Sequence, residues 1–131
     1  TVYCFDVLES ALEAVKNRAY IMGINNIVTQ RSNLEKLHGS GLKDGAVAHI
    51  VMRKILVQND DKPTLFAEAF RVLQDSGTLL VVGWNENAVE GFDILARLAP
   101  EKVVQLGKET GFTHITPIDA GLYHYAYVFT K

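Results

Sequence analysis

The side chains best suited to chemistry stand where four predicted strands end. Ligands of open parallel sheets bind in the crevice at the carboxyl ends of the strands. At such an edge a carboxylate can accept from ligand hydroxyls, a cation can hold an anionic group, and an indole can stack on a flat ring. The candidates in this sequence are Asp6, Val7, Ser32, Asn33, Arg53 and Trp84.

Each of the stronger candidates has a structural alternative that the sequence leaves open. Asp6 either accepts from the hydroxyls of a ribose or caps the helix that follows its strand. Arg53, with Lys54 beside it, either binds an anionic substrate or forms a solvated strand end. Trp84 either stacks on a ligand or packs against its neighbours. No residue stands out as catalytic.

Other kinds of active site find no support in the order of residues. The four histidines lack the mutual spacing of a metal site, and the single cysteine, Cys4, has no partner for a thiolate site. No Ser-His-Asp or Cys-His arrangement can be argued, and no phosphate-binding loop of the Gly-x-x-x-x-Gly-Lys type is present. We therefore expect no metal centre.

The elements that position these residues are organised around residues 65–84. Leu65, Phe66, Ala69, Phe70 and Leu73 form a stripe at helical spacing. This helix is expected to stop within residues 74–77, with Gly77 in the left-handed conformation. Residues 78–83 then run apolar without alternation, which is typical of a strand buried on both faces of a parallel sheet.

The other elements extend this unit into one α/β domain over residues 1–131. Strands are predicted at 2–7, 27–30 and 46–52, and helices at 8–22, within 85–99, and from Pro100 to Gly111. Residues 113–118 and 124–130 alternate and read as an antiparallel hairpin. The fold class is a three-layer, doubly wound, mostly parallel sheet with a C-terminal antiparallel hairpin.

Composition narrows the classes of partner. The 13 basic and 15 acidic residues are spread along the chain, so nucleic acid is not an expected partner. No apolar run approaches the length of a membrane helix, which is about 20 residues. One cysteine fits a reducing compartment, and we expect a cytoplasmic protein without membrane contact.

The sequence resembles the class I S-adenosylmethionine-dependent methyltransferases. Arg71-Val-Leu73, followed by Gly77 and the apolar run to Trp84, resembles their helix–strand segment. Residues 2–19 resemble their second strand and its helix, and Gly111-Phe112 with the hairpin resembles their last two strands. The resemblance implies S-adenosylmethionine as cofactor, with Asp6 and Val7 at the ribose and Ser32 and Asn33 at the adenine.

The departures from the family pattern concern the cofactor site. The family's first strand and its Asp/Glu-x-Gly-x-Gly loop would precede Thr1. Gly39-Ser-Gly41 cannot replace that loop, because it comes before a strand and not after one. Asn33 stands where the family often has an aspartate, and Ala48 replaces an acid common in the fourth family strand.

Two functions follow from this pattern. The first is a methyltransferase acting on a small molecule, whose first strand and glycine loop are supplied from outside these residues. The second is a non-catalytic binding or oligomerisation module that has lost the cofactor cradle. In the second case the exposed sheet would be covered in a homodimer or higher oligomer, with residues 2–7 beside 46–52 or with the space filled in trans.

Overall fold

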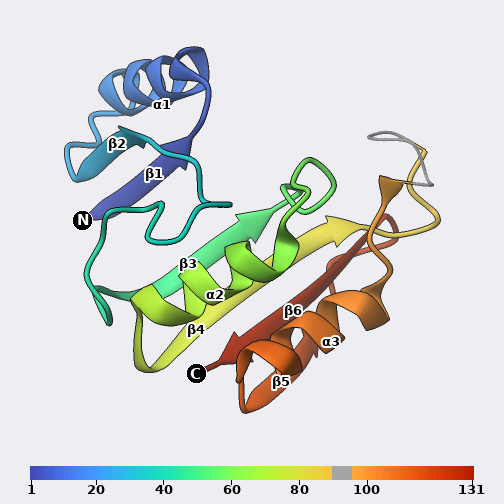
Figure 1. Cartoon of the computed structure of the whole chain (residues 1–131). Coiled ribbons are helices and arrows are strands. Elements are labelled where there is room, and N and C mark those ends of the chain that lie inside the picture. Colours follow the sequence, from blue (N-terminus) through green and yellow to red (C-terminus); the bar gives the residue numbers. More distant parts are fainter. Residues whose placement is uncertain (90–95) are drawn as a thin grey trace.

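The computed structural model describes residues 1–89 and 96–131. Its amino-terminal part is a β-α-β unit (Figure 1). Strand β1 (Val2–Asp6) runs parallel to β2 (Ile27–Arg31), and α1 (Glu9–Ile21) connects them. Leu12 and Ala19 of α1 are buried. Gly23 follows the helix with φ of 66°, as the sequence predicts for a helix end.

The remaining strands form a separate four-stranded sheet in the order β3-β4-β6-β5. Their bounds are Val47–Arg53 (β3), Leu73–Trp84 (β4), His114–Ile118 (β5) and His124–Thr130 (β6). The β3–β4 pair is parallel, and β6 is antiparallel to both β4 and β5. The predicted terminal hairpin is therefore confirmed, with its last strand inserted beside β4.

Helix α2 (Lys62–Val72) begins as the sequence predicts. Asp61 caps it by accepting from the Thr64 amide at 3.0 Å, and proline occupies the first turn. The Thr64 hydroxyl also donates to Asp61 Oδ2. The two hydrogen bonds from Thr64 together lower the pKa of Asp61. The apolar stripe of α2 is buried against the sheet, with Phe66 fully enclosed.

The predicted end of α2 is wrong in detail. The helix ends at Val72, and β4 begins at once with Leu73. Ser76, with φ of 62°, takes the left-handed conformation expected of Gly77. Gly77 is needed for close approach instead, because a Cβ there would lie 2.8 Å from the carbonyl oxygen of Gln74. The regular β3–β4 ladder starts one residue later, at Thr78.

Helix α3 (Pro100–Thr110) lies beside α2 on one face of the four-stranded sheet (Figure 1). It ends at Gly111, whose φ of 113° confirms the predicted left-handed cap. The core between helices and sheet is aromatic, with Phe112 edge-on to Phe129 and Phe129 edge-on to Phe66. Of the helix predicted within residues 85–99, residues 90–95 lie outside the described residues, and the described residues 85–89 and 96–99 contain no α-helix.

The two sheets are separate in the described part of the chain. Strand β1 pairs with β2, and β3 pairs with β4, but β1 and β3 do not pair with each other. The expected direct pairing of residues 2–7 with 46–52 is therefore absent within one chain. Val2, Tyr3 and Val51 on these strands remain 51%, 40% and 65% exposed. The described part of the fold thus has two sheets, the parallel β1–β2 pair and a mixed sheet in which only β6 is antiparallel.

Candidate functional site

The carboxyl ends of β1 and β2 bring the predicted cofactor residues together. The Ser32 amide donates to the Asp6 carbonyl at 2.9 Å, which extends the ladder past Arg31. Arg31 Nε donates to the carbonyl of Val7 at 3.0 Å. Asp6, Val7 and Ser32 therefore share one edge, with Asn33 next in the chain. We call this the β1–β2 edge.

The carboxylate of Asp6 holds the turn that precedes α1 and has room for a ligand. Its Oδ1 accepts from the Leu8 amide at 2.8 Å, at the entry to α1. This contact forms a local turn before the helix and does not cap it, because α1 has no side-chain cap hydrogen bond among the described residues. Within residues 1–89 and 96–131, no hydrogen bond involves Oδ2, so one oxygen can still accept from a hydroxyl. The ribose role stays a prediction.

Asn33 is exposed, and its side-chain oxygen is already engaged. Oδ1 accepts from the Glu35 amide at 2.9 Å and turns the chain into the loop. An adenine amino group is a donor and needs an acceptor. Asn33 can offer the second lone pair of Oδ1 or the hydrogens of its amide, so its geometry suits adenine less well than a carboxylate would.

A second edge, at the ends of β3 and β4, holds Arg53 and Trp84. Lys54 Nζ lies 3.6 Å from the centroid of the Trp84 ring, and His124 stacks on the indole at 4.5 Å between centroids. Lys54 follows β3 and His124 opens β6, the two neighbours of β4 in the sheet. The indole thus contacts side chains from both neighbouring strands, as its packing alternative requires. Its role toward a substrate is still untested.

His124 is a member of this edge that the sequence did not single out. Its Nε2 is buried and has no hydrogen-bond partner among the described residues. Burial lowers the pKa of His124, and the charges of Lys54 and Arg53 lower it further. No local sequence pattern points to it, because His124 lies opposite Trp84 only through the pairing of β6 with β4.

A buried ionic cluster on α2 was also missed. Glu68 Oε1 accepts from the amide and the hydroxyl of Ser40, at 3.0 and 2.6 Å, and from Arg71 Nη2 at 2.7 Å. Arg71 also donates to Asp44 Oδ1 at 2.7 Å. Burial opposes ionisation of Glu68, but the hydrogen bonds from Arg71 and Ser40 outweigh it and lower the pKa to about 2. The sequence signal for the pair is the spacing of three residues between Glu68 and Arg71, which places an acid and a base side by side on a helix.

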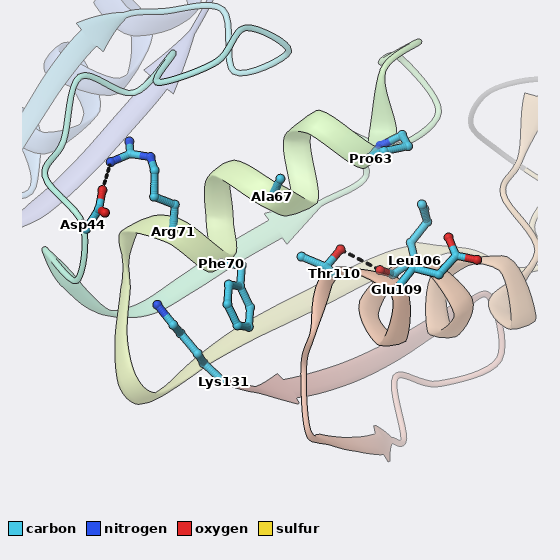
Figure 2. Close-up of a pocket in the computed structure, with 9 residues that line it drawn as sticks. All are labelled: Asp44, Pro63, Ala67, Phe70, Arg71, Leu106, Glu109, Thr110 and Lys131. Atoms are coloured by element: carbon cyan, nitrogen blue, oxygen red, sulfur yellow. Dashed lines mark hydrogen bonds and ion pairs between the residues drawn. The ribbon is translucent and has the colours of Figure 1, made fainter.

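A shallow groove of about 560 Å³ runs between α2, α3 and the last residue (Figure 2). Lys131 reaches across it, donating to the carbonyl of Leu73 at 2.8 Å with its ammonium 4.7 Å from the Phe70 ring. None of the predicted site residues lines this groove. Its lining residues are Asp44, Pro63, Ala67, Phe70, Arg71, Leu106, Glu109, Thr110 and Lys131.

Neither a metal centre nor a membrane-spanning helix is found among the described residues. They contain no group of three or more His, Cys, Asp or Glu side chains placed to hold a metal ion. None of their helices has the length and apolar character needed to cross a membrane.

Known structures with the same fold were found, although no protein-family model and no curated protein matches the sequence. A SAM-dependent methyltransferase from Aquifex aeolicus superimposes with a TM-score of 0.87 at 19% identity, over 99% of this chain and 68% of its own. A putative type 11 methyltransferase from Sulfolobus solfataricus gives 0.76 at 23% identity, over 97% and 68%.

The same fold also serves another reaction. The [4+2]-cyclase SpnF superimposes with a TM-score of 0.82 at 11% identity, over 100% of this chain and 66% of its own. At these identities the likeness establishes the fold alone. The chain has a methyltransferase-like Rossmann fold and spans about two thirds of the length of these proteins.

Proposed function

We propose that this chain is the larger part of an S-adenosylmethionine-dependent methyltransferase that acts on a small molecule. The observation that carries the proposal is the interrupted sheet, β2-β1 and β3-β4-β6-β5, in a chain that superimposes over almost its whole length on longer methyltransferase structures. Among the described residues, strands β1 and β3 each have one unpaired edge, and a single parallel strand between them would join the two sheets. We infer that a segment outside these 131 residues supplies it, together with the glycine loop.

The residues present suit only part of the cofactor. Asp6, through Oδ2, would accept from the ribose hydroxyls, and Ser32 and Asn33 would lie at the adenine. Among the described residues nothing supplies a cradle for the methionine part, so that part of the site depends on the inferred strand. The bound cofactor would supply an activated methyl group for transfer to a nucleophile.

Arg53 and Trp84 would lie on the acceptor side of the cleft. Arg53 is exposed at the carboxyl end of β3, where its guanidinium would hold an anionic acceptor. Methyl transfer needs alignment of the nucleophile with the methyl group more than acid–base chemistry. This accounts for the lack of an evident catalytic group at either edge. We also propose a cytoplasmic location, on the basis of the single cysteine.

The test is calorimetric titration with S-adenosylhomocysteine. It should be run on this chain and on a chimera in which a methyltransferase strand, glycine loop and helix precede Thr1. We expect saturable binding by the chimera that weakens at least about tenfold, or about 1.4 kcal/mol, in Asp6→Ala. Asp60→Ala, an exposed acid in the loop before α2, is the control and should bind normally. Absence of binding by a folded chimera would contradict the proposal.

A second function is favoured by the exposed apolar residues of the two open edges. Val2, Tyr3 and Val51 are exposed where the sheet is interrupted, and unpaired strand edges invite association. A non-catalytic module would cover these edges in a homodimer or higher oligomer. Sedimentation velocity at high concentration separates the cases: a stable oligomer that is lost in Val51→Lys supports the module, and a clean monomer excludes it.

A further inference from the structure

The loop of residues 32–46 crosses from the first sheet to the second and is tied down at both ends. It leaves the carboxyl end of β2 at the β1–β2 edge and enters the second sheet at the amino end of β3 (Figure 1). The two sheets do not share a ladder of hydrogen bonds. Side-chain contacts of this loop must therefore help to set how the β1–β2 edge stands relative to β3 and β4.

Gln30, the fourth residue of β2, fastens the loop to the first sheet. Its Nε2 donates to Ser32 Oγ at 3.1 Å and to the Ser40 carbonyl at 3.0 Å. An amide has two N–H donors, so both are used. Ser32 in turn donates its backbone amide to the carbonyl of Asp6 at 2.9 Å. The exposed side chain of Gln30 thus connects the loop, through Ser32, to Asp6, the residue predicted to bind the ribose.

Ser40 connects the same loop to helix α2, which packs on the second sheet. It is 3% exposed, and its amide and hydroxyl both donate to Glu68 Oε1. Glu68 is 6% exposed on α2 and is itself held by two hydrogen bonds from Arg71. Hydrogen bonds to a buried carboxylate are strong and leave little freedom. Ser40 is therefore a fixed point to which Gln30 is attached.

We propose that Glu68, Ser40 and Gln30 form a positioning relay that fixes the β1–β2 edge for ligand binding. Gln30 is the positioning residue: it acts on Ser32 and, through it, on Asp6. The part of this inference that concerns the ligand rests on the proposed function. A nucleoside bound at this edge and a methyl group presented near β3 must keep their relative place, and a displacement of about 1 Å can reduce activity about 100-fold.

The test compares Gln30→Met with Gln58→Met. Methionine keeps the shape of glutamine and removes the donors without changing charge. Gln58 is exposed in the loop before α2, so its substitution is a matched control. The two readouts are amide hydrogen exchange at Ser32 and Ser40, and binding of S-adenosylhomocysteine to the chimera described above.

In Gln30→Met we expect the Ser32 amide to exchange at least about tenfold faster, while amides of β4 and β6 and the melting temperature stay unchanged. We also expect binding to weaken about tenfold, with Gln58→Met unaffected. Unchanged exchange at Ser32, or a loss of protection throughout the chain, would overturn the relay. If the unmodified chimera binds no ligand, the proposed function fails, and the exchange at Ser32 still decides whether the relay exists.

Discussion

Trp84 and His124 face each other across the β4–β6 ladder, with their rings stacked 4.5 Å apart and inclined by 26°. Lys54 approaches the indole from the other neighbouring strand. A cation close to an imidazole disfavours a second positive charge. The stack therefore links the protonation of His124 to the surroundings of Trp84, which is the only tryptophan in the chain.

This link predicts a pH-dependent fluorescence signal. A protonated imidazole in ring contact quenches indole emission, so Trp84 fluorescence should fall as His124 gains a proton. Because burial and the neighbouring charges lower the pKa of His124, the midpoint should lie below 6.5. The measurement is an emission titration from pH 8 to pH 4. His124→Gln should abolish the transition, and a midpoint at or above 6.5 would contradict the assignment.

Removal of the Lys54 charge should move that midpoint upward. Lys54→Met eliminates one of the charges that lower the pKa of His124, so the fluorescence midpoint should rise toward 6.5. Burial is the larger cause, and therefore a full return is not expected. Lys62→Met, on α2, changes the net charge equally and serves as the control. An unchanged midpoint in Lys54→Met would show that the charge is screened from the imidazole.

Glu68 should make stability depend on acid. The pKa of Glu68 is lowered from its usual 4.5 to about 2, so the folded state is stabilised above pH 4.5 and loses this contribution as pH falls toward 2. Glu68→Gln breaks a buried pair with Arg71 and should cost about 3 kcal/mol at pH 7. Urea unfolding at pH 7 and pH 2 should show the difference between the proteins shrinking at the lower pH.

An exposed acid on α1 provides the comparison. Glu13 pairs with Lys16 at 2.6 Å, and both side chains are about half exposed. Water screens a solvent-exposed pair, so Glu13→Gln should change stability little at either pH. Equal losses in Glu13→Gln and Glu68→Gln would show that the buried cluster has no special role.

Local sequence patterns predicted those parts of the fold that depend on local physics. The apolar run before Trp84, the cap at Gly111 and the alternating hairpin each reflect burial or backbone geometry within a few residues. The end of α2 was misplaced, because Leu73 can continue the helical stripe or begin a strand. Packing of Leu73 into the sheet decided between them, and the serine at 76 accepted the left-handed conformation.

The candidate sites depend on contacts between distant segments. Asp6, Val7 and Ser32 could be placed together because carboxyl ends of parallel strands share an edge. Ser40 and Glu68 are 28 residues apart, and no local pattern pairs a loop serine with a glutamate on a later helix. His124 lies opposite Trp84 only because β6 pairs with β4, which no local pattern predicts. Sequence reasoning therefore located the first edge and missed the ionic cluster and the stacked imidazole.

Gly107 gives a test of the aromatic core. This glycine is buried in α3, one turn before the end of the helix, and a Cβ there would collide with the ring of Phe129. Alanine normally favours a helix over glycine by about 1 kcal/mol. Here the collision should dominate, and Gly107→Ala should destabilise the protein by about 1 to 2 kcal/mol. Thermal unfolding is the measurement, with Lys108→Ala on the exposed face as the control.

The contact itself can be isolated with a double-mutant cycle. Phe129→Leu destabilises the core on its own, but it also removes the ring that blocks a Cβ at position 107. If the collision is the cause, Gly107→Ala should be neutral or stabilising in the Phe129→Leu background, with a coupling free energy of about 1 kcal/mol or more. Additive effects would place the cost of Gly107→Ala elsewhere in α3, and the packing of this helix on β6 would need another explanation.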